Sequence, residues 1–189
     1  MKTHSPAQRE RIYLTGFMGS GKSTIGPILA NTLGYDFADV DRVVETSEGV
    51  AVSEIFREKG EAYFRAKELQ ALVALSVRPH LVISLGGGTL VQPAAFQLIR
   101  STGILVYLKM SHDEVVRRLH HRTDRPLLLD AEGEKLPEDQ FRARIERLYR
   151  ERSPFYEAAD VVVATDETRV GMTVDRIVKL IRHDIAPTP

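Results

Sequence analysis

The sequence predicts an α/β fold in which a parallel sheet is covered by helices on both faces. Short apolar runs alternate with longer segments of helical periodicity, a pattern typical of successive βαβ units. The most apolar of these runs, 81–85, suits a strand that is buried on both faces, as strands of parallel sheets are. The predicted fold class is therefore a three-layer α/β/α arrangement.

Turn and cap residues set the expected bounds of the elements. Pro79 stops a long helical pattern, Pro93 suits a first helical position, and Ser111 suits an N-cap. Strands are expected at 12–15, 36–38, 81–85, 104–109 and 161–164. Helices are expected at 22–33, 41–47, 52–59, 61–77, 94–100, 112–120, 138–151 and 170–183.

Length and composition indicate one domain over residues 1–189, with frayed tails at 1–9 and 185–189. The chain is 43% hydrophobic and 28% charged, and its 26 basic residues balance its 26 acidic ones, which argues against bulk nucleic-acid binding. It has no cysteine, and no apolar stretch reaches the ~18 residues of a membrane span. We therefore expect a cytoplasmic monomer with no nucleic-acid or membrane partner.

Residues 16–23 form a complete Gly-x-x-x-x-Gly-Lys-Ser phosphate-binding loop between the first expected strand and the first expected helix. Glycines let the backbone wrap around phosphates, and the helix N-terminus favours negative charge. Lys22 is expected to reach the β- and γ-phosphate oxygens, and Ser23 to offer its hydroxyl to Mg²⁺. The chain is therefore expected to bind a nucleoside triphosphate. The residues expected at the nucleotide are Gly19, Ser20, Gly21, Lys22, Ser23 and Thr24.

Asp39 and Asp41 follow the second expected strand, at the edge of the sheet where open α/β folds bind ligands. If this segment stays extended, alternate side chains point the same way, so both carboxylates would face one pocket. One would hold the water shell of Mg²⁺, and the other would accept a hydrogen bond or a proton from a substrate hydroxyl. The alternative is a pair of helix-capping and surface aspartates, because Asp-x-Asp is a short and common motif.

Three consecutive glycines, Gly86, Gly87 and Gly88, follow the expected strand 81–85 at the same edge of the sheet. Such a triplet allows a ligand to approach the backbone closely and to meet its N–H donors. A flexible turn is the structural alternative.

Arg65, Arg125 and Arg152 are candidates for binding an anion, because arginine clamps carboxylates and neutralises transferring phosphoryl groups. The arginines close to Arg152 in the sequence alternate with glutamates, as in the pair Glu138 and Arg142. This pattern is typical of a solvated helix. The six histidines show no metal-ligand spacing.

Residues 121–137 have neither a helical nor a strand period. Long loops in compact domains are usually functional or disordered. Next to a phosphate-binding loop, we expect a mobile lid that closes over the substrates and excludes water. A solvated surface insertion is the alternative.

In their order and spacing, these motifs resemble those of the shikimate kinases, which belong to the nucleoside-monophosphate-kinase-like group. The matching segments are 16–26, 39–41, 56–65, 86–88, 125–128 and 152–156. The resemblance implies a P-loop kinase with a five-stranded parallel sheet and a closing lid. It also implies ATP-dependent phosphorylation of the 3-hydroxyl of shikimate, with one Mg²⁺, in aromatic amino-acid biosynthesis.

The resemblance implies roles for the residues that match the family motifs. On the acceptor side, Asp41 would contact ring hydroxyls, and Arg65 and Arg152 would bind the shikimate carboxylate. The backbone of Gly86, Gly87 and Gly88 would also contact shikimate.

On the donor side, the resemblance implies that Ser23 binds Mg²⁺ directly, with Asp39 and Ser84 in its outer shell. Arg122 would lie against adenine, and Arg125 would reach the transferring phosphate. Residues 165–167 would also border the base. The expected catalytic residues are Lys22, Asp41 and Arg125.

One segment departs from the family, because the acidic stretch 130–135 makes the expected lid longer than that of compact members. Two other functions stay open. A gluconate-kinase-like enzyme would share the phosphate loop but not the whole set of acceptor motifs, and a non-catalytic nucleotide-binding regulator would not need a phosphoryl-transfer arginine. Assays with both acceptors, and ADP release that depends on shikimate, would separate these functions.

Overall fold

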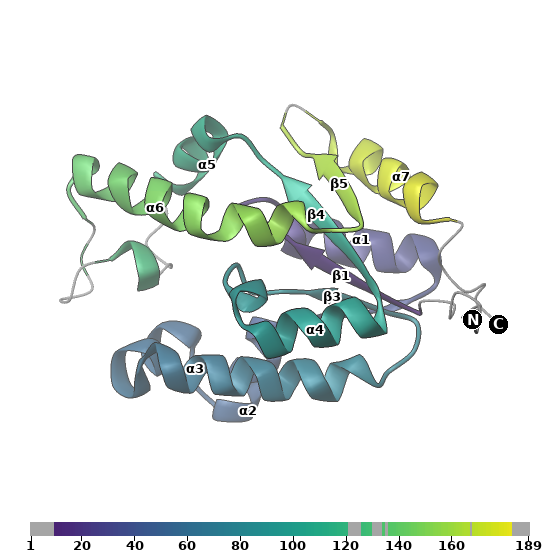
Figure 1. Cartoon of the computed structure of the whole chain (residues 1–189), viewed down its shortest axis with the longest axis horizontal. Coiled ribbons are helices and arrows are strands. Elements are labelled where there is room, and N and C mark those ends of the chain that lie inside the picture. Colours follow the sequence, from purple (N-terminus) through teal and green to yellow (C-terminus); the bar gives the residue numbers. More distant parts are fainter. Residues whose placement is uncertain (1–9, 121–125, 130–133, 135, 167, 183–189) are drawn as a thin grey trace, which may run out of the picture.

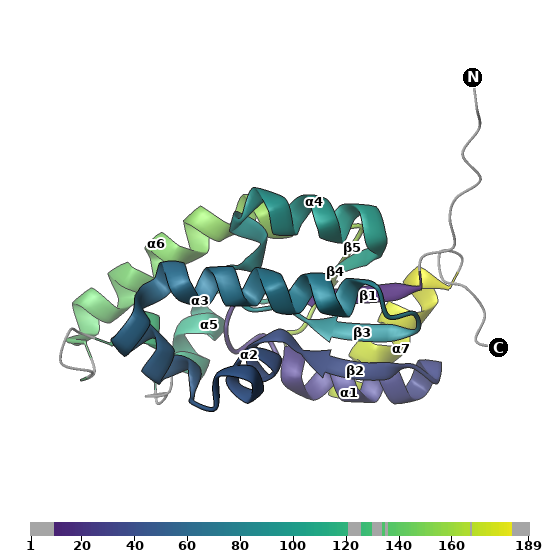
Figure 2. The same cartoon turned by 90° about the horizontal axis from the view of Figure 1, so that it is seen from below.

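The computed structural model describes residues 10–120, 126–129, 134, 136–166 and 168–182. Within these residues, five parallel strands form one sheet in the order β2-β3-β1-β4-β5 (Figure 1, with β2 labelled in Figure 2). The strands are β1 (Arg11–Thr15), β2 (Asp36–Asp39), β3 (Leu81–Ser84), β4 (Ile104–Lys109) and β5 (Val161–Ala164). The α-helices are α1 (Lys22–Leu33), α2 (Val40–Glu48), α3 (Val52–Ser76), α4 (Pro93–Thr102), α5 (His112–Leu119), α6 (Glu138–Glu157) and α7 (Val170–Ile181). Two short 3₁₀ helices are η1 (Thr89–Val91) and η2 (Pro126–Leu128).

Alternating residues of the central strands enter two separate hydrophobic cores. Tyr13 and Tyr107 pack into one core, under α3, α4 and α6. Ile12, Leu14 and Val106 pack into the other, under α1 and α7. Figure 2 shows α3 and α4 on one side of the sheet and α1 and α7 on the other. Because side chains alternate along a strand, a sheet that is apolar on both faces needs this double cover, and the predicted α/β/α layering is confirmed.

The predicted strands and helices all form, and the largest error concerns the end of α6. Pro93 is at the N-terminus of α4, and the Ser111 hydroxyl caps α5 by accepting from the Glu114 N–H at 3.4 Å. The helix expected to end at residue 151 continues to Glu157, through Pro154. Pro154 removes one helix hydrogen bond, to the carbonyl of Arg150, which is an exposed residue that water can reach.

Several expectations fall on residues outside the described ranges. The tails at 1–9 and 185–189 lie outside them, as does most of the expected lid at 121–137. The single domain therefore stays a prediction, and so does the mobile lid. Among the described helices, none is long and apolar enough to cross a membrane.

The long helix α3 breaks at Gly60, whose φ of 79° and ψ of 170° divide it into the two helices that the sequence predicts. The Glu48 carboxylate at the end of α2 holds both halves together. It accepts from Lys59 Nζ before the break and from Tyr63 Oη after it, each at 2.9 Å, and it pairs with Lys67 Nζ at 2.9 Å. This clamp fixes the angle between the two halves, and α3 carries Arg65.

The Glu48 clamp makes stability depend on pH. Hydrogen bonds from Lys59 and Lys67 lower the pKa of the Glu48 carboxyl from 4.5 to about 2. A lowered pKa stabilises the folded state at pH values above 4.5, and this stabilisation is lost as the pH falls toward 2. Glu48→Gln should therefore lower the free energy of unfolding at neutral pH and lose less of it on acidification than the wild type. Urea unfolding at a series of acidic pH values measures both effects, and parallel curves would contradict them.

Candidate active site

The phosphate loop 16–23 closes over the carboxyl end of β1 and leads into α1. Gly16, Gly19 and Gly21 have φ values of 144°, 82° and 94°, which side chains other than that of glycine rarely allow. At Gly16, a Cβ atom would also lie 2.6 Å from the Leu108 carbonyl oxygen. The loop therefore needs these glycines for their conformation.

A cavity of about 320 Å³, here called the loop cavity, opens above this loop. Lys22, Ser23 and Thr24 line it, and Lys22 Nζ donates to the carbonyl oxygens of Gly16 and Phe17 at 2.7 and 3.1 Å. Gly19, Gly21 and Ser84 line it as well. Ser20 does not, because its side chain is buried. The described residues that are expected at the phosphates and the metal therefore line the loop cavity, with the exception of Ser20.

Asp39 and Asp41 both line the loop cavity, but the geometry expected for them is wrong. The segment does not stay extended, because α2 begins at Val40, and Asp41 is in its first turn. Asp39 caps the helix: its Oδ1 accepts from the N–H groups of Asp41 and Arg42 at 3.1 and 3.3 Å. Asp39 is therefore a cap and a cavity residue at once, so the two alternatives do not exclude each other.

A second, smaller cavity adjoins the loop cavity and is here called the arginine cavity. Its lining includes Arg65, Arg152 and the glycine triplet, and it shares Met18, Asp41, Gly86 and Gly87 with the loop cavity. Apolar side chains, Phe56 and Phe64 among them, complete its wall. The structure thus brings the expected acceptor residues together beside Lys22, Ser23 and Thr24 of the loop cavity.

The glycine triplet provides space rather than an unusual backbone conformation, since none of its three φ values is positive. A Cβ atom at Gly86 would lie 3.0 Å from Asp41 Oδ1, and one at Gly87 would lie 3.1 Å from Arg152 Nη1. A Cβ at Gly88 would collide with the guanidinium of Arg65. These contacts show that neighbouring side chains leave little room for a residue larger than glycine, and the close approach of a ligand to this backbone stays a prediction.

Two side chains that the sequence analysis did not single out hold the acceptor residues in place. Glu68 is fully buried and accepts from Arg65 Nη1 at 2.8 Å, from Thr89 Oγ1 at 2.5 Å and from Gln92 Nε2 at 2.9 Å. Tyr156, also buried, donates its hydroxyl to the Gly87 carbonyl. The three-residue spacing between Arg65 and Glu68 on α3 is a signal that could have identified Glu68.

Gly88→Ala should raise the KM for the small-molecule acceptor and leave the KM for the nucleotide unchanged. The added methyl group would push against the Arg65 guanidinium, which cannot move away easily because Glu61 and Glu68 hold it at 2.9 and 2.8 Å. Steady-state kinetics with each substrate varied in turn would measure this. A matched Gly171→Ala variant, where a Cβ meets nothing within 4 Å, should leave both constants unchanged.

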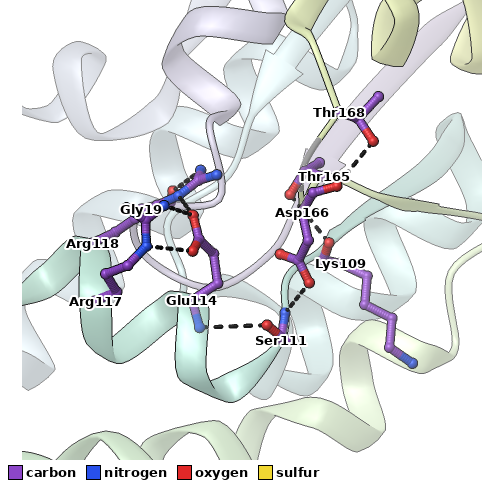
Figure 3. Close-up of polar contacts among 9 residues, drawn as sticks. All are labelled: Gly19, Lys109, Ser111, Glu114, Arg117, Arg118, Thr165, Asp166 and Thr168. Atoms are coloured by element: carbon purple, nitrogen blue, oxygen red, sulfur yellow. Dashed lines mark hydrogen bonds and ion pairs between the residues drawn. The ribbon is translucent and has the colours of Figure 1, made fainter.

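A groove of about 600 Å³ on the other side of the phosphate loop is here called the β5 groove. Arg118 of α5 lines both this groove and the loop cavity. Figure 3 shows Arg118 Nη1 donating to the Gly19 carbonyl at 3.1 Å and Arg118 Nε donating to Glu114 at 2.6 Å. Across the groove, Asp166 Oδ2 accepts from the Ser111 N–H at 2.9 Å, and Thr165 also lines the wall. The groove therefore continues the loop cavity away from the arginine cavity.

Arg122, Arg125 and Glu167 lie outside the described residues. Among the described residues, no group of three or more His, Cys, Asp or Glu side chains could hold a metal ion. The expected ion pair on the solvated helix α6 is present, with Arg142 Nε at 2.7 Å from Glu138 Oε1.

The fold and the phosphate loop define a P-loop kinase, and a second cavity adjoins the one above the loop. The family model for shikimate kinase matches residues 18–182. The chain therefore belongs to the shikimate kinase family, whose members transfer phosphate from ATP to an alcohol group of shikimate.

Individual relatives agree with this assignment. The chain is 50% identical over 172 residues to the shikimate kinase of Chlorobium chlorochromatii, covering 91% of this chain and 90% of that protein. Its fold is similar to the solved structure of shikimate kinase from Acinetobacter baumannii in complex with shikimate, with a TM-score of 0.84, 31% identity and coverage of 94% and 95%. A gluconokinase from Sinorhizobium meliloti matches with a TM-score of 0.56, 22% identity and coverage of 93% and 94%, which shows a shared fold only. The gluconate-kinase-like alternative is therefore not supported.

Proposed function

We propose that the two adjoining cavities hold the two substrates of the kinase reaction in line with each other. ATP would place its phosphates in the loop cavity, and shikimate would occupy the arginine cavity. The observation that carries this proposal is the shared wall of Met18, Asp41, Gly86 and Gly87, because it puts an acceptor within reach of the γ-phosphate. Bringing the reactants together in this way supplies much of the rate enhancement in phosphoryl transfer.

The charges of the arginine cavity support an anionic acceptor. Arg152 is only 5% exposed, and among the described residues it makes no ion pair, whereas Arg65 pairs with Glu61 and Glu68. The guanidinium carbon of Arg152 lies 5.8 Å from the centre of the Phe17 ring, which attracts a cation but carries no net charge. A buried cation without an anionic partner is costly unless an anion binds to it. The shikimate carboxylate would be that anion, held between Arg152 and Arg65. Polar groups of Asp41 and of the glycine triplet would then bind the ring hydroxyls.

The proposed transfer needs little covalent chemistry from the protein. Asp41 would accept a hydrogen bond from the 3-hydroxyl of shikimate. This hydrogen bond would direct a lone pair of the hydroxyl oxygen at the γ-phosphorus. Lys22 would stabilise the charge that moves toward the leaving β–γ bridging oxygen. Because the transition state of phosphoryl transfer is loose, the hydroxyl proton can pass late to the Asp41 carboxylate, so orientation by Asp41 matters more than its basicity.

The donor atoms of the loop cavity fit a magnesium ion that is bound mainly through the nucleotide. Ser23 offers a hydroxyl, and Asp39 and Ser84 lie in the same cavity, so these three side chains all offer hard oxygen atoms. Mg²⁺ commonly uses one or two protein groups together with phosphates and waters, which agrees with the absence of a larger acidic cluster in the described residues. When bound, the ion would neutralise phosphate charge. Ser23 would bind it directly, and Asp39 through water.

The β5 groove is the proposed site of the adenine base. It continues the loop cavity past Arg118, whose planar guanidinium suits the face of a base, and Thr165 and Asp166 lie on the opposite wall. The role of Arg122 against adenine stays a prediction, and Arg118 is the described arginine that lines both the loop cavity and the β5 groove. Arg125 would reach the transferring phosphate from a lid at 121–137.

Composition and size carry the remaining parts of the proposal. Balanced charge and size favour a cytoplasmic monomer of one domain, with no nucleic-acid or membrane partner. Shikimate, ATP and Mg²⁺ would then be what the reaction requires.

Magnesium titration of a Ser23→Ala variant tests the metal assignment. Loss of a direct ligand should raise the Mg²⁺ concentration that gives half-maximal turnover and leave the KM for shikimate unchanged. Thr24→Ala is the matched control, since it removes a neighbouring hydroxyl that also lines the loop cavity. If the two variants respond to Mg²⁺ alike, Ser23 is not the metal ligand.

A further inference from the structure

A third space, here called the outer cleft, adjoins the arginine cavity on the side away from the loop cavity. Its volume is about 380 Å³, and it shares Arg65, Gly88, Leu127 and Arg152 with the arginine cavity. The shared residues include both proposed carboxylate-binding arginines. An anion in the outer cleft would therefore lie next to the proposed acceptor position in the arginine cavity.

Two further arginines, Arg144 and Arg147, line the outer cleft from α6. They are three residues apart and so lie on one face of the helix. Arg144 Nη1 donates to the Leu127 carbonyl at 3.2 Å, and among the described residues Arg144 makes no ion pair. Arg147 Nε is 3.7 Å from Glu151 Oε1, too far for a hydrogen bond, and its side chain is 58% exposed. Both guanidinium groups can therefore bind another anion.

The outer cleft is locally positive although the chain as a whole is neutral. Four arginines line it against two glutamates, Glu61 and Glu151, while the chain has 26 basic and 26 acidic residues. Without Arg144 and Arg147, the charges of the lining would cancel. At physiological salt, exposed charges act over about 8 Å, so only a local cluster can attract a small anion to this position.

We propose that the outer cleft is the entry site for the anionic acceptor, where Arg144 and Arg147 hold its carboxylate before it passes to Arg152 and Arg65. The inference rests on the proposed function of the arginine cavity and adds the route by which shikimate reaches it. A cleft lined with charge of one sign raises the local concentration of an oppositely charged substrate. Arg144 and Arg147 do not touch the bound acceptor, so they act on association and not on the chemical step.

The test is the double variant Arg144→Gln/Arg147→Gln, studied by steady-state kinetics over a range of ionic strength. At low salt, kcat/KM for shikimate should fall about tenfold, and its dependence on ionic strength should flatten. The values of kcat and of KM for ATP should not change. The matched control is Arg142→Gln/Arg150→Gln, which removes the same charge from exposed positions of α6 outside the cleft lining and should behave as the wild type. Arg144→Lys/Arg147→Lys should restore the salt dependence.

Two results would overturn the entry site. One is a salt dependence of the cleft variant equal to that of the wild type. The other is a fall in kcat with an unchanged salt slope, which would indicate a structural role for the two arginines. Failure of the proposed function itself would look different, because the wild type would then show no shikimate-dependent turnover at any ionic strength.

Discussion

Lys22→Ala is expected to lower kcat by about 10²- to 10³-fold, the usual effect of removing one preorganised donor to developing charge. Lys22 is at the N-terminus of α1, and its ammonium group lies over the loop carbonyls of Gly16 and Phe17 at 2.7 and 3.1 Å. From this position the ammonium group can stabilise the negative charge that develops on the β–γ bridging oxygen. We expect the KM for shikimate to change little, because Lys22 does not line the arginine cavity.

Two controls separate charge stabilisation by Lys22 from a structural effect on the loop. ADP binding, measured by calorimetry, and thermal unfolding show whether the Lys22→Ala loop still binds phosphates. Lys22→Arg keeps the charge but replaces a compact ammonium group with a planar guanidinium group. Turnover of this variant should also be slow. Turnover of Lys22→Ala within tenfold of the wild type would contradict the role of this side chain.

Arg152→Met should weaken shikimate binding and, in the same molecule, stabilise the ligand-free protein. A charged hydrogen bond contributes about 1.5–3 kcal/mol, which corresponds to an increase of about 10- to 150-fold in the dissociation constant for shikimate. The stability gain is expected because Arg152 is only 5% exposed and, within the described residues, makes no ion pair. Replacing a buried charge with an apolar side chain of similar volume is often neutral or stabilising.

Calorimetric titration with shikimate and thermal unfolding without ligand measure the two effects of Arg152→Met. Arg150→Met is the matched control on the same helix, where the residue is exposed and both quantities should stay near their wild-type values. An unchanged shikimate affinity would remove Arg152 from the acceptor site. A large loss of stability would show that its charge is compensated inside the folded protein.

Much of the fold could be predicted because strong local signals coincide with the tertiary arrangement. The phosphate loop at 16–23 marks the first strand and the first helix, and the apolar runs have no solvent-facing alternation. The end of α6 could not be predicted from local rules. Pro154 predicts a helix end, but continuing the helix buries Tyr156, and that packing outweighs one lost hydrogen bond.

Site residues could be predicted where a sequence motif implies their chemistry. Residues that act by holding an arginine of the site in an ion pair could not be predicted. Asp41 reaches the expected cavity, but from a helix turn and not from an extended segment. The sequence does not indicate a site role for Glu68 or Glu114, because glutamates three or four residues from arginines are common on helix surfaces. Only the tertiary structure reveals that Glu68 is fully buried and that Arg118, held by Glu114, contacts the phosphate loop.

Shikimate-dependent ADP release is the most direct test of the central claim that one site presents the γ-phosphate of ATP to a hydroxyl of shikimate beside Asp41. With ATP and Mg²⁺ present, the wild-type protein should release one ADP for each shikimate consumed, and none when gluconate replaces shikimate. Asp41→Asn should lower this rate without abolishing ATP binding. ATP binding with no ADP release on addition of shikimate, or equal release with gluconate, would contradict the account.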